Sequence, residues 1–383
     1  MTEQAQPVAP HTTIAQYFGD LPDPRTGPAK LHVLLDLLTI ALLAVICGAD
    51  DWVAVHDFGV AREAWLKTFL ALPHGIPSHD TFGRVFSLLR PEELQRRYLG
   101  WIRHVAQLAD GEHVALDGKV LRGSADASWG QEALVMLSAY ASTAGLVLAQ
   151  VAVPADTNEI AVLPELLKLL GLGGCVVTVD AAHCQVENAR LITAQGGDYV
   201  FALKANAGAL FERVADTFEH TDYGIAHPSR HTTVEKGHGR LERRQYAAIT
   251  APDYLAYFDP DRRWEQLKSV IRVERERTRG EVTERQVHYY IASLAADARV
   301  LAGYIRSHWH IENKEHWLLD VTFHEDDSRA RAGFEPENLA VLRHLALNLL
   351  KREATLKRSI KGKRFTAALD QAYLLKVLLA GSA

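Results

Sequence analysis

Apolar residues in the first 110 positions recur every three to four residues, which is the spacing of helices that bury one face. Ser78, which follows a proline, and Pro91 are residues that favour the start of a helix. The predicted helices span 13–18, 31–47, 51–70, 78–89 and 91–105. We therefore expect residues 1–110 to form a helical N-terminal domain that serves recognition or assembly.

From Glu112 onward the pattern changes to short apolar runs rich in β-branched residues. The predicted strands span 113–122, 133–142, 146–154, 175–183 and 198–206, with helices over 159–170 and 186–195. The order strand, strand, strand, helix, strand, helix, strand is that of the ribonuclease-H-like sheet, whose first and fourth strands are neighbours. The predicted fold is therefore α/β, with a ribonuclease-H-like mixed five-stranded sheet and flanking helices that begins within residues 111–206.

Residues 207–294 interrupt this order. After a helix near 210–218, alternating stretches with β propensity follow, separated by glycine and proline. These stretches span 231–236, 240–249, 267–278 and 284–294. They predict a mainly β insertion, after which residues 295–350 return to core helices and residues 351–383 form a basic helical tail.

One segment, Tyr304–Arg331, gathers histidines, acids and tryptophans without a proline or glycine. We interpret it as an amphipathic helix with Trp309, Leu318 and Val321 in a buried stripe. His308, Glu312 and His316 are four residues apart, which places them on one helix face. A core helix whose polar residues are simply satisfied is an equally good explanation of this segment alone. Trp309 and Trp317 are predicted to lie in the core, with base stacking as the alternative.

The composition is that of an ordinary soluble globular protein, with 383 residues, 48% hydrophobic and 23% charged. Cys47, Cys175 and Cys184 form no CxxC pair and indicate buried thiols in a reducing compartment. The polar N-terminus lacks a signal-peptide pattern, and the most apolar run, Leu31–Gly48, is short for a membrane span. We expect a cytoplasmic, nucleoid-associated protein without membrane contact.

The net charge of −5 does not by itself indicate a nucleic-acid-binding protein, but local patches decide contact. Residues 351–364 hold seven basic residues against one acid. This tail is more one-sided than the mixed stretch 262–285, so it is the better candidate for phosphate contact, with a solvated helix face as the alternative.

Two aspartates, Asp117 and Asp180, end the first and fourth predicted strands. If these strands are neighbours, both carboxylates emerge at one sheet edge, where a helix packed across the sheet can bring Glu312. Three converging carboxylates require a cation or raised pKa values. Hard oxygen ligands favour Mg²⁺, with Mn²⁺ as a substitute, and two ions about 4 Å apart support in-line phosphoryl displacement. A lone aspartate after a strand is more often a turn or cap residue.

The chain resembles the DDE transposases of bacterial insertion sequences, in the H-repeat-associated (ISAs-type) branch. The resemblance rests on motifs along nearly the whole chain: FGDLPDPR, GIPSHDTFGRVF, ALDGKVLRGS, VDAAHCQ, KANAG, HWHIENKEHWLLDVTFHEDDSRAR and PENLAVLRHLALNLLK. It implies a ribonuclease-H-like core with a β insertion, and Asp117, Asp180 and Glu312 as the metal-binding catalytic triad. It also implies cleavage of double-stranded DNA at transposon ends, strand transfer into target DNA, and work as a homo-oligomer on DNA.

The sequence departs from related transposases at three offsets around the helix glutamate, where those proteins carry Tyr, Arg and Lys and this chain has Ile305, His308 and Leu319. Phosphate contacts must then come from other basic side chains. The candidates are Lys119, Arg122, Lys204, Arg306, Lys314, Arg329 and Arg331. Candidate accessory residues are His183, Asp320 and Asp326.

Two other functions are compatible with the sequence. A zinc metallohydrolase would use His308, Glu312 and His316, but it would lack an HExxH-type base and leave both strand aspartates unexplained. An inactive or domesticated DNA-binding relic would keep the same fold without moving DNA.

Overall fold

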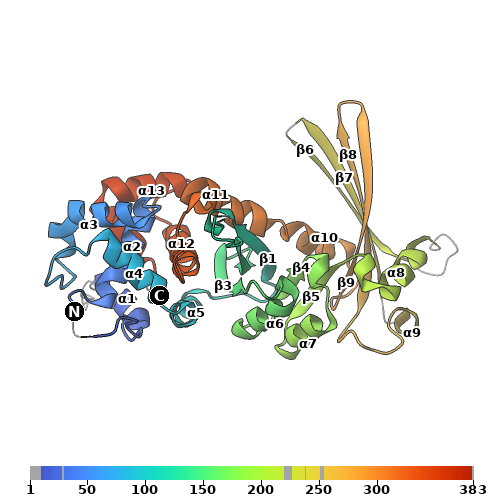
Figure 1. Cartoon of the computed structure of the whole chain (residues 1–383). Helices are drawn as coiled ribbons and strands as arrows, with labels where there is room; N and C mark the ends of the chain where they lie inside the picture. Colours follow the sequence, from blue (N-terminus) through green and yellow to red (C-terminus); the bar gives the residue numbers. More distant parts are fainter. Residues whose placement is uncertain are drawn as a thin grey trace, which may run out of the picture.

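The computed structural model describes residues 10–27, 30–126, 128–219, 227–237, 239–250 and 254–381. Its centre is one nine-stranded sheet with the order β3-β2-β1-β4-β5-β9-β8-β7-β6 (Figure 1). The strands are β1 His113–Leu121, β2 Leu134–Ala141, β3 Leu146–Val153, β4 Val176–Val179, β5 Asp198–Leu203, β6 Ser229–Gly237, β7 Arg240–Thr250, β8 Ser269–Arg279 and β9 Val282–Ala292. The helices before the insertion are α1 Pro10–Phe18, α2 Leu34–Cys47, α3 Trp52–Leu66, α4 His79–Leu88, α5 Pro91–Val105, α6 Glu159–Leu169 and α7 Val186–Ala194. The later helices are α8 Ala209–Glu219, α9 Leu255–Phe258, α10 Ala298–Ser307, α11 Trp317–Phe323, α12 Glu335–Arg352, α13 Ile360–Leu369 and α14 Gln371–Leu379.

The first five strands confirm the predicted ribonuclease-H-like order. β1 pairs antiparallel with β2 and parallel with β4, β2 pairs antiparallel with β3, and β4 pairs parallel with β5. β4 is only four residues long and entirely buried, because its apolar side chains face helices on both sides of the sheet. The first and fourth strands are therefore neighbours, as the element order required.

The insertion does not form a separate sheet. β9 pairs antiparallel with β5 over Val200–Leu203, and β8, β7 and β6 follow it outward, so the five predicted core strands become nine. Figure 1 shows β6, β7 and β8 running as long strands away from the helical body. The reason is the free edge of β5, whose backbone donors and acceptors find partners in the last insertion strand.

Helices from both ends of the chain pack together beside the sheet. α12 contacts α2, α4 and α5, while α14 contacts α1 and α2. The predicted start at Ser78 is confirmed, because its side chain accepts a hydrogen bond from the Thr81 N–H. The helical tail predicted over 351–383 holds two helices, α13 and α14, separated at Asp370, whose carboxylate caps the first turn of α14.

No single helix in the described ranges is long and apolar enough to cross a membrane. α2 and α3 meet the length and composition together, but they bend by 99° at their junction.

The basic tail is less available for phosphate contact than its charge suggested. The ammonium of Lys363 donates to the carbonyls of Leu350 and Glu353, and the guanidinium of Arg364 donates to those of Thr322 and Val45. Both side chains are buried. These two cations therefore hold the last helices onto the body and are not available for the phosphate contact predicted for this tail.

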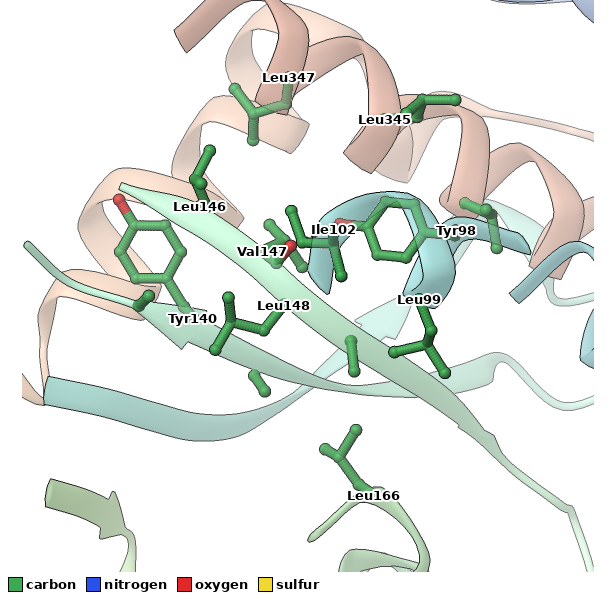
Figure 2. Packing of buried hydrophobic residues seen from close by; sticks show 14 of the residues in the cluster. Tyr98, Leu99, Ile102, Tyr140, Leu146, Val147, Leu148, Leu166, Leu345 and Leu347 are labelled. Carbon is green, nitrogen blue, oxygen red and sulfur yellow. Dashed lines mark hydrogen bonds between the residues drawn. The ribbon is translucent and has the colours of Figure 1, made fainter. Parts of the chain in front are cut away.

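The outer edge of the core sheet is closed by an asparagine of α12. Asn348 is fully buried; its amide N–H₂ donates to the Val147 carbonyl and the Tyr98 hydroxyl, and its oxygen accepts from the Val147 N–H. Figure 2 shows Val147 on β3, with Leu345 and Leu347 of α12 above the strand and Tyr98 of α5 to one side. The amide thus replaces the strand that β3 lacks on this side.

We expect Asn348→Leu to lower the free energy of unfolding by about 2–3 kcal/mol, because it leaves the buried Val147 N–H without its partner and removes one of the two donors to the Val147 carbonyl, the other being the Tyr98 hydroxyl. Tyr98→Phe removes only one hydroxyl and should cost about 1 kcal/mol. Urea denaturation followed by circular dichroism measures both. Equal, near-zero effects would mean that the asparagine does not close the strand edge.

Candidate active site

The sheet register places Asp117 and Asp180 side by side. Ala115 of β1 is paired with Thr178 of β4, and each aspartate lies two residues further along its own strand direction. Because side chains alternate along a strand, both aspartates lie on the same face as these two partners. The prediction that Asp117 ends its strand is wrong, since β1 continues to Leu121, but β4 ends at Val179 and leaves that part of β1 open on this side.

The segment that carries Glu312 is not the continuous α-helix predicted over Tyr304–Arg331. α10 ends at Ser307, a turn follows, and residues Glu312–His316 form a π-helical turn before α11. α11 ends at Phe323, because His324 adopts a left-handed backbone with φ of +48°. The wider π-turn changes which residues share a helix face, so the four-residue spacing predicted for His308, Glu312 and His316 does not hold. Such turns are frequent at functional sites.

The π-turn points two glutamates in different directions. Glu315 is fully buried with its carboxylate 3.1 Å from the imidazole Nε2 of His344 on α12, whereas Glu312 is exposed. The ammonium of Lys351 donates to the Lys314 carbonyl at 3.2 Å and so satisfies backbone that the π-turn leaves open. α12 therefore fixes the turn that presents Glu312 to the solvent-facing side.

The tryptophans of this segment are surface residues. Trp309 is 47% exposed and Trp317 is 55% exposed, so the prediction that both lie in the core is wrong. Val321, assigned to the same buried stripe, is 48% exposed. The buried positions are instead Ile311, Leu319 and Phe323, as expected once the π-turn shifts the apolar face.

His308 belongs to a buried hydrogen-bonded chain and not to the solvent-facing site. Its Nδ1 lies 2.9 Å from the Thr178 hydroxyl, which lies 2.7 Å from His113 Nε2. Burial lowers the pKa of His308 to about 4 and that of His113 to about 3, so both imidazoles are neutral. With His316 Nδ1 turned toward Asp117 at 3.8 Å, the predicted zinc set of His308, Glu312 and His316 is not formed.

Asp117 and Glu312 line an open pocket of about 490 Å³, together with His316, Trp317 and Asp320. Burial, and then the negative charges of Glu312, Asp180 and Glu159, raise the pKa of Asp117 to about 7. Within the described ranges, no lysine or arginine forms an ion pair with Asp117, Asp180 or Glu312. This part of the site is therefore a group of uncompensated carboxylates.

The oxygen donors suit a hard divalent cation such as Mg²⁺. As they lie, no three His, Cys, Asp or Glu side chains of the described residues are close enough together to share one ion, and Asp180 is not among the residues that line the pocket. Glu312 is exposed, so its side chain has room to turn toward Asp117. The carboxylate oxygens are therefore suitable ligands for a divalent cation, but binding of the cation would have to bring these side chains closer together.

A second acidic cluster, of which Asp320 and Asp326 line the same pocket, is paired with a lysine. The ammonium of Lys119 is buried and lies 2.7 Å from Asp320, 3.1 Å from Glu325 and 3.1 Å from Asp326. Burial alone would lower the pKa of Lys119, but the surrounding carboxylates raise it. Lys119 is therefore not free to bind DNA, and its position gives the predicted accessory acids Asp320 and Asp326 a role in holding this lysine.

The turn after β1 and the loop after α11 are in direct contact. Gly123 lies so close to this loop that a β-carbon would overlap the Ser328 carbonyl. Arg331 donates to the Gly123 carbonyl and to Asp126, both at 3.0 Å, so this arginine connects the two segments and is not an open phosphate contact.

The other predicted DNA contacts are more accessible. Arg306 is half-exposed and paired with Glu235 of β6 at 2.7 Å. Arg122, on the pocket rim, has a side chain that is 81% exposed. Exposed cations also occur at Lys204, Lys314 and Arg329.

Sequence reasoning missed one acid at the site. Glu159, the first residue of α6, lies with its carboxylate 3.2 Å from His183 Nε2 and contributes to the raised pKa of Asp117. His183 is 1% exposed, so the predicted accessory residue faces this glutamate and not the open pocket. The sequence offered one signal: Glu159 directly follows Asn158, a residue type that caps helices, after the third strand. We interpreted this pair only as the start of a helix.

The strand order and the grouped carboxylates define a ribonuclease-H-like protein with an acidic site. The Transposase DDE domain family model matches residues 108–349, and the DDE_Tnp_1-associated model matches residues 15–102. Two Escherichia coli (strain K12) proteins, "Putative protein YbfL" and "H repeat-associated putative transposase YhhI", are each 35% identical over 373 residues, covering 96% of this chain and 98% of theirs. The chain belongs to the DDE transposases, in the H-repeat-associated branch.

Among solved structures, a piggyBac transposase synaptic complex with hairpin DNA matches with a TM-score of 0.41 and 10% identity. The match covers 94% of this chain and 76% of that one.

The raised pKa of Asp117 predicts a pH-dependent stability cost in metal-free buffer. An aspartate has a pKa near 3.9 when unfolded, so this group lowers the stability as the pH rises from about 4 to about 7. We expect Asp117→Asn to raise the free energy of unfolding at pH 8 by on the order of 2 kcal/mol. At pH 4 the wild type and the variant should differ little.

Denaturant unfolding at both pH values, in the presence of EDTA, measures this difference. A variant that gains no stability at pH 8 relative to pH 4 would contradict the cost of holding an ionised Asp117 in this buried, acidic position.

Proposed function

We propose that this transposase cleaves insertion-sequence ends and joins them to target DNA by divalent-metal-dependent, in-line phosphoryl transfer. The observation that supports the proposal is that Glu312 lines one pocket with Asp117, while the negative charges of Glu312 and Asp180 contribute to the raised pKa of Asp117. Acids from two strands and a distant helix have no structural reason to gather without a lysine or arginine, whereas the nearby cluster around Lys119 is neutralised.

Asp117, Asp180 and Glu312 would hold Mg²⁺, or Mn²⁺ in its place. Two such ions activate an attacking water or hydroxyl and stabilise the leaving oxygen. The chain's own contribution is geometric: β1 and β4 fix the two aspartates, and the contact between Glu315 and His344 fixes the turn that presents Glu312. His316 faces Asp117 and limits the directions in which that carboxylate can turn.

We infer that double-stranded DNA reaches the pocket along exposed basic side chains at its rim and nearby. Arg122 lines the pocket, Lys314 is exposed within the π-turn, and Arg329 is exposed in the loop after α11. With a net charge of −5, such local cations must supply the attraction for phosphates. The resemblance to insertion-sequence transposases further suggests that more than one subunit holds the DNA ends.

Trp317 supports a contact with a base next to the cleaved phosphate. It lines the same pocket as Asp117 and Glu312 although more than half of its surface is exposed. A large exposed aromatic ring beside a phosphate-binding site is suited to stacking on an unpaired base.

We expect Asp117→Ala, Asp180→Ala and Glu312→Gln each to abolish cleavage and joining of the element's own terminal repeats in Mg²⁺, because each removes an oxygen ligand. DNA binding should change little in each variant. Glu187→Gln, which alters an exposed glutamate on α7, is the matched control and should cleave like the wild type.

The measurements are a gel assay for cleavage and joining and a fluorescence-anisotropy assay for binding. Activity that survives any one triad substitution would remove that residue from the site. A wild type that binds the ends but never cleaves them would instead favour a domesticated DNA-binding relic.

We expect Trp317→Ala to weaken the contact with one base by about 1–3 kcal/mol, and Trp317→Phe to retain much of it. The fluorescence of 2-aminopurine placed beside the cleavage site should rise on binding to the wild type and rise less with Trp317→Ala, because fewer bases are unstacked from the duplex. Phe365→Ala, which removes an exposed ring on α13, serves as the control. Identical signals from wild type and Trp317→Ala would exclude stacking by this residue.

A further inference from the structure

Four side chains form a continuous line of hydrogen-bonding contacts next to the candidate site. His113 lies between two hydroxyl groups, with Nδ1 2.8 Å from Ser142 Oγ and Nε2 2.7 Å from Thr178 Oγ1. The same Thr178 hydroxyl lies 2.9 Å from His308 Nδ1. Burial lowers the pKa of His113 to about 3 and that of His308 to about 4, so both imidazoles are neutral. We call these four side chains the imidazole–hydroxyl network.

The network joins the three segments that carry the proposed metal ligands. One member lies on β1, one on β4 and one in the turn after α10. Each of these members precedes a triad acid by two to four residues. The pairs of network member and acid are His113 and Asp117, Thr178 and Asp180, and His308 and Glu312.

The members depend on each other for their hydrogen bonds. A neutral imidazole has one N–H and one acceptor nitrogen, and a hydroxyl group donates only one hydrogen bond. Thr178 can therefore donate to one of its two imidazole neighbours, and the other imidazole must donate to it. Loss of this hydroxyl would leave a nitrogen of each histidine without its partner, which is costly for buried groups.

His308 is the member that the Glu312 segment contributes. α10 ends at Ser307, and the π-turn begins at Glu312. The contact with Thr178 therefore anchors this segment to β4 shortly before the turn that presents the glutamate. Related transposases carry an arginine at this position, but a neutral imidazole suits a buried position better than a guanidinium, which stays charged.

Buried polar side chains are usually hydrogen-bonded simply because an unpaired polar group is costly. That ordinary explanation accounts for the bonds but not for polar groups on all three segments, since apolar side chains of similar shape can be equally stable. Hydrogen bonds require a defined distance and direction, whereas apolar contacts are non-directional. A network of this kind therefore fixes the relative placement of the segments that it joins.

We propose that His113, Thr178 and His308 are positioning residues, whose hydrogen bonds hold β1, β4 and the Glu312 segment at the separation from which the triad acids close on a divalent cation. This inference rests on the proposed function. As they lie, no three His, Cys, Asp or Glu side chains of the described residues can hold an ion. With the backbones fixed by the network, the closing movement is left to the side chains of the acids.

The test is a titration of the full-length chain with Mn²⁺, in which electron paramagnetic resonance measures the free ion without DNA or turnover. Thr178→Val removes the central hydroxyl at nearly constant volume, and we expect it to weaken Mn²⁺ binding by about tenfold or more. Thr178→Ser keeps the hydroxyl and should bind like the wild type. The matched control is Thr193→Val, which removes a buried hydroxyl of α7 that donates to the Ala189 carbonyl. This control should also bind like the wild type, and Asp117→Asn should lose binding.

The contact between Thr178 and His308 gives a second comparison. His308→Leu should weaken Mn²⁺ binding by itself, but it should cause little further loss when added to Thr178→Val, as expected for two residues that act through one contact. His308→Asn should retain more binding than His308→Leu, because the asparagine amide can take the place of the ring Nδ1. Circular dichroism establishes that each variant is folded before it is titrated.

Binding by Thr178→Val and His308→Leu that equals the wild type, with Asp117→Asn impaired, overturns this inference and leaves the triad proposal intact. Unchanged binding in all three variants overturns the triad proposal together with it. Equal weakening by Thr178→Val and Thr193→Val would show that the loss reflects only reduced stability, and would also contradict the inference.

Discussion

The constraint on which the proposed function depends is the burial of one carboxyl group, Asp117, near other acids and without a lysine or arginine partner among the described residues. Burial, and then the charges of Glu312, Asp180 and Glu159, raise the pKa of Asp117 to about 7, as expected for a carboxyl group held out of water without a cation. The parallel pairing of β1 with β4 sets two of these acids side by side, and no relaxation of side chains can separate their strands. The strand order therefore imposes a free-energy cost for holding these acids near each other.

The molecule contains two acidic clusters that it treats differently. Asp320, Glu325 and Asp326 surround the buried ammonium of Lys119. Asp326 also pairs with Arg122 and Glu325 with Arg343, so three cations balance the three carboxylates within the chain. Among the described residues, Asp117 and Asp180 lie within ion-pair distance of imidazoles and of no lysine or arginine. A protein that neutralises one cluster and leaves its neighbour charged retains a place for an external cation, and this contrast supports the proposed activity better than the acids alone.

Much of the fold followed from local patterns. The five core strands, the four insertion strands and most helices were predicted because their apolar periodicity and capping residues are local properties. The π-turn at Glu312–His316 was not predicted, because it depends on α12, which is distant in sequence. His344 of α12 contacts Glu315, and Lys351 of α12 donates to the Lys314 carbonyl. The same shift explains why Trp309 was wrongly predicted to be buried. Roles of Lys119 and Glu159 likewise depend on partners that periodicity cannot reveal.

The most direct test of the central claim is anomalous X-ray diffraction from crystals of the protein soaked in Mn²⁺. This account predicts a manganese peak within bonding distance of Asp117 and Asp180, with Glu312 turned toward it. Ordered manganese elsewhere in the molecule, with these three carboxylates unliganded at a saturating concentration, would contradict it.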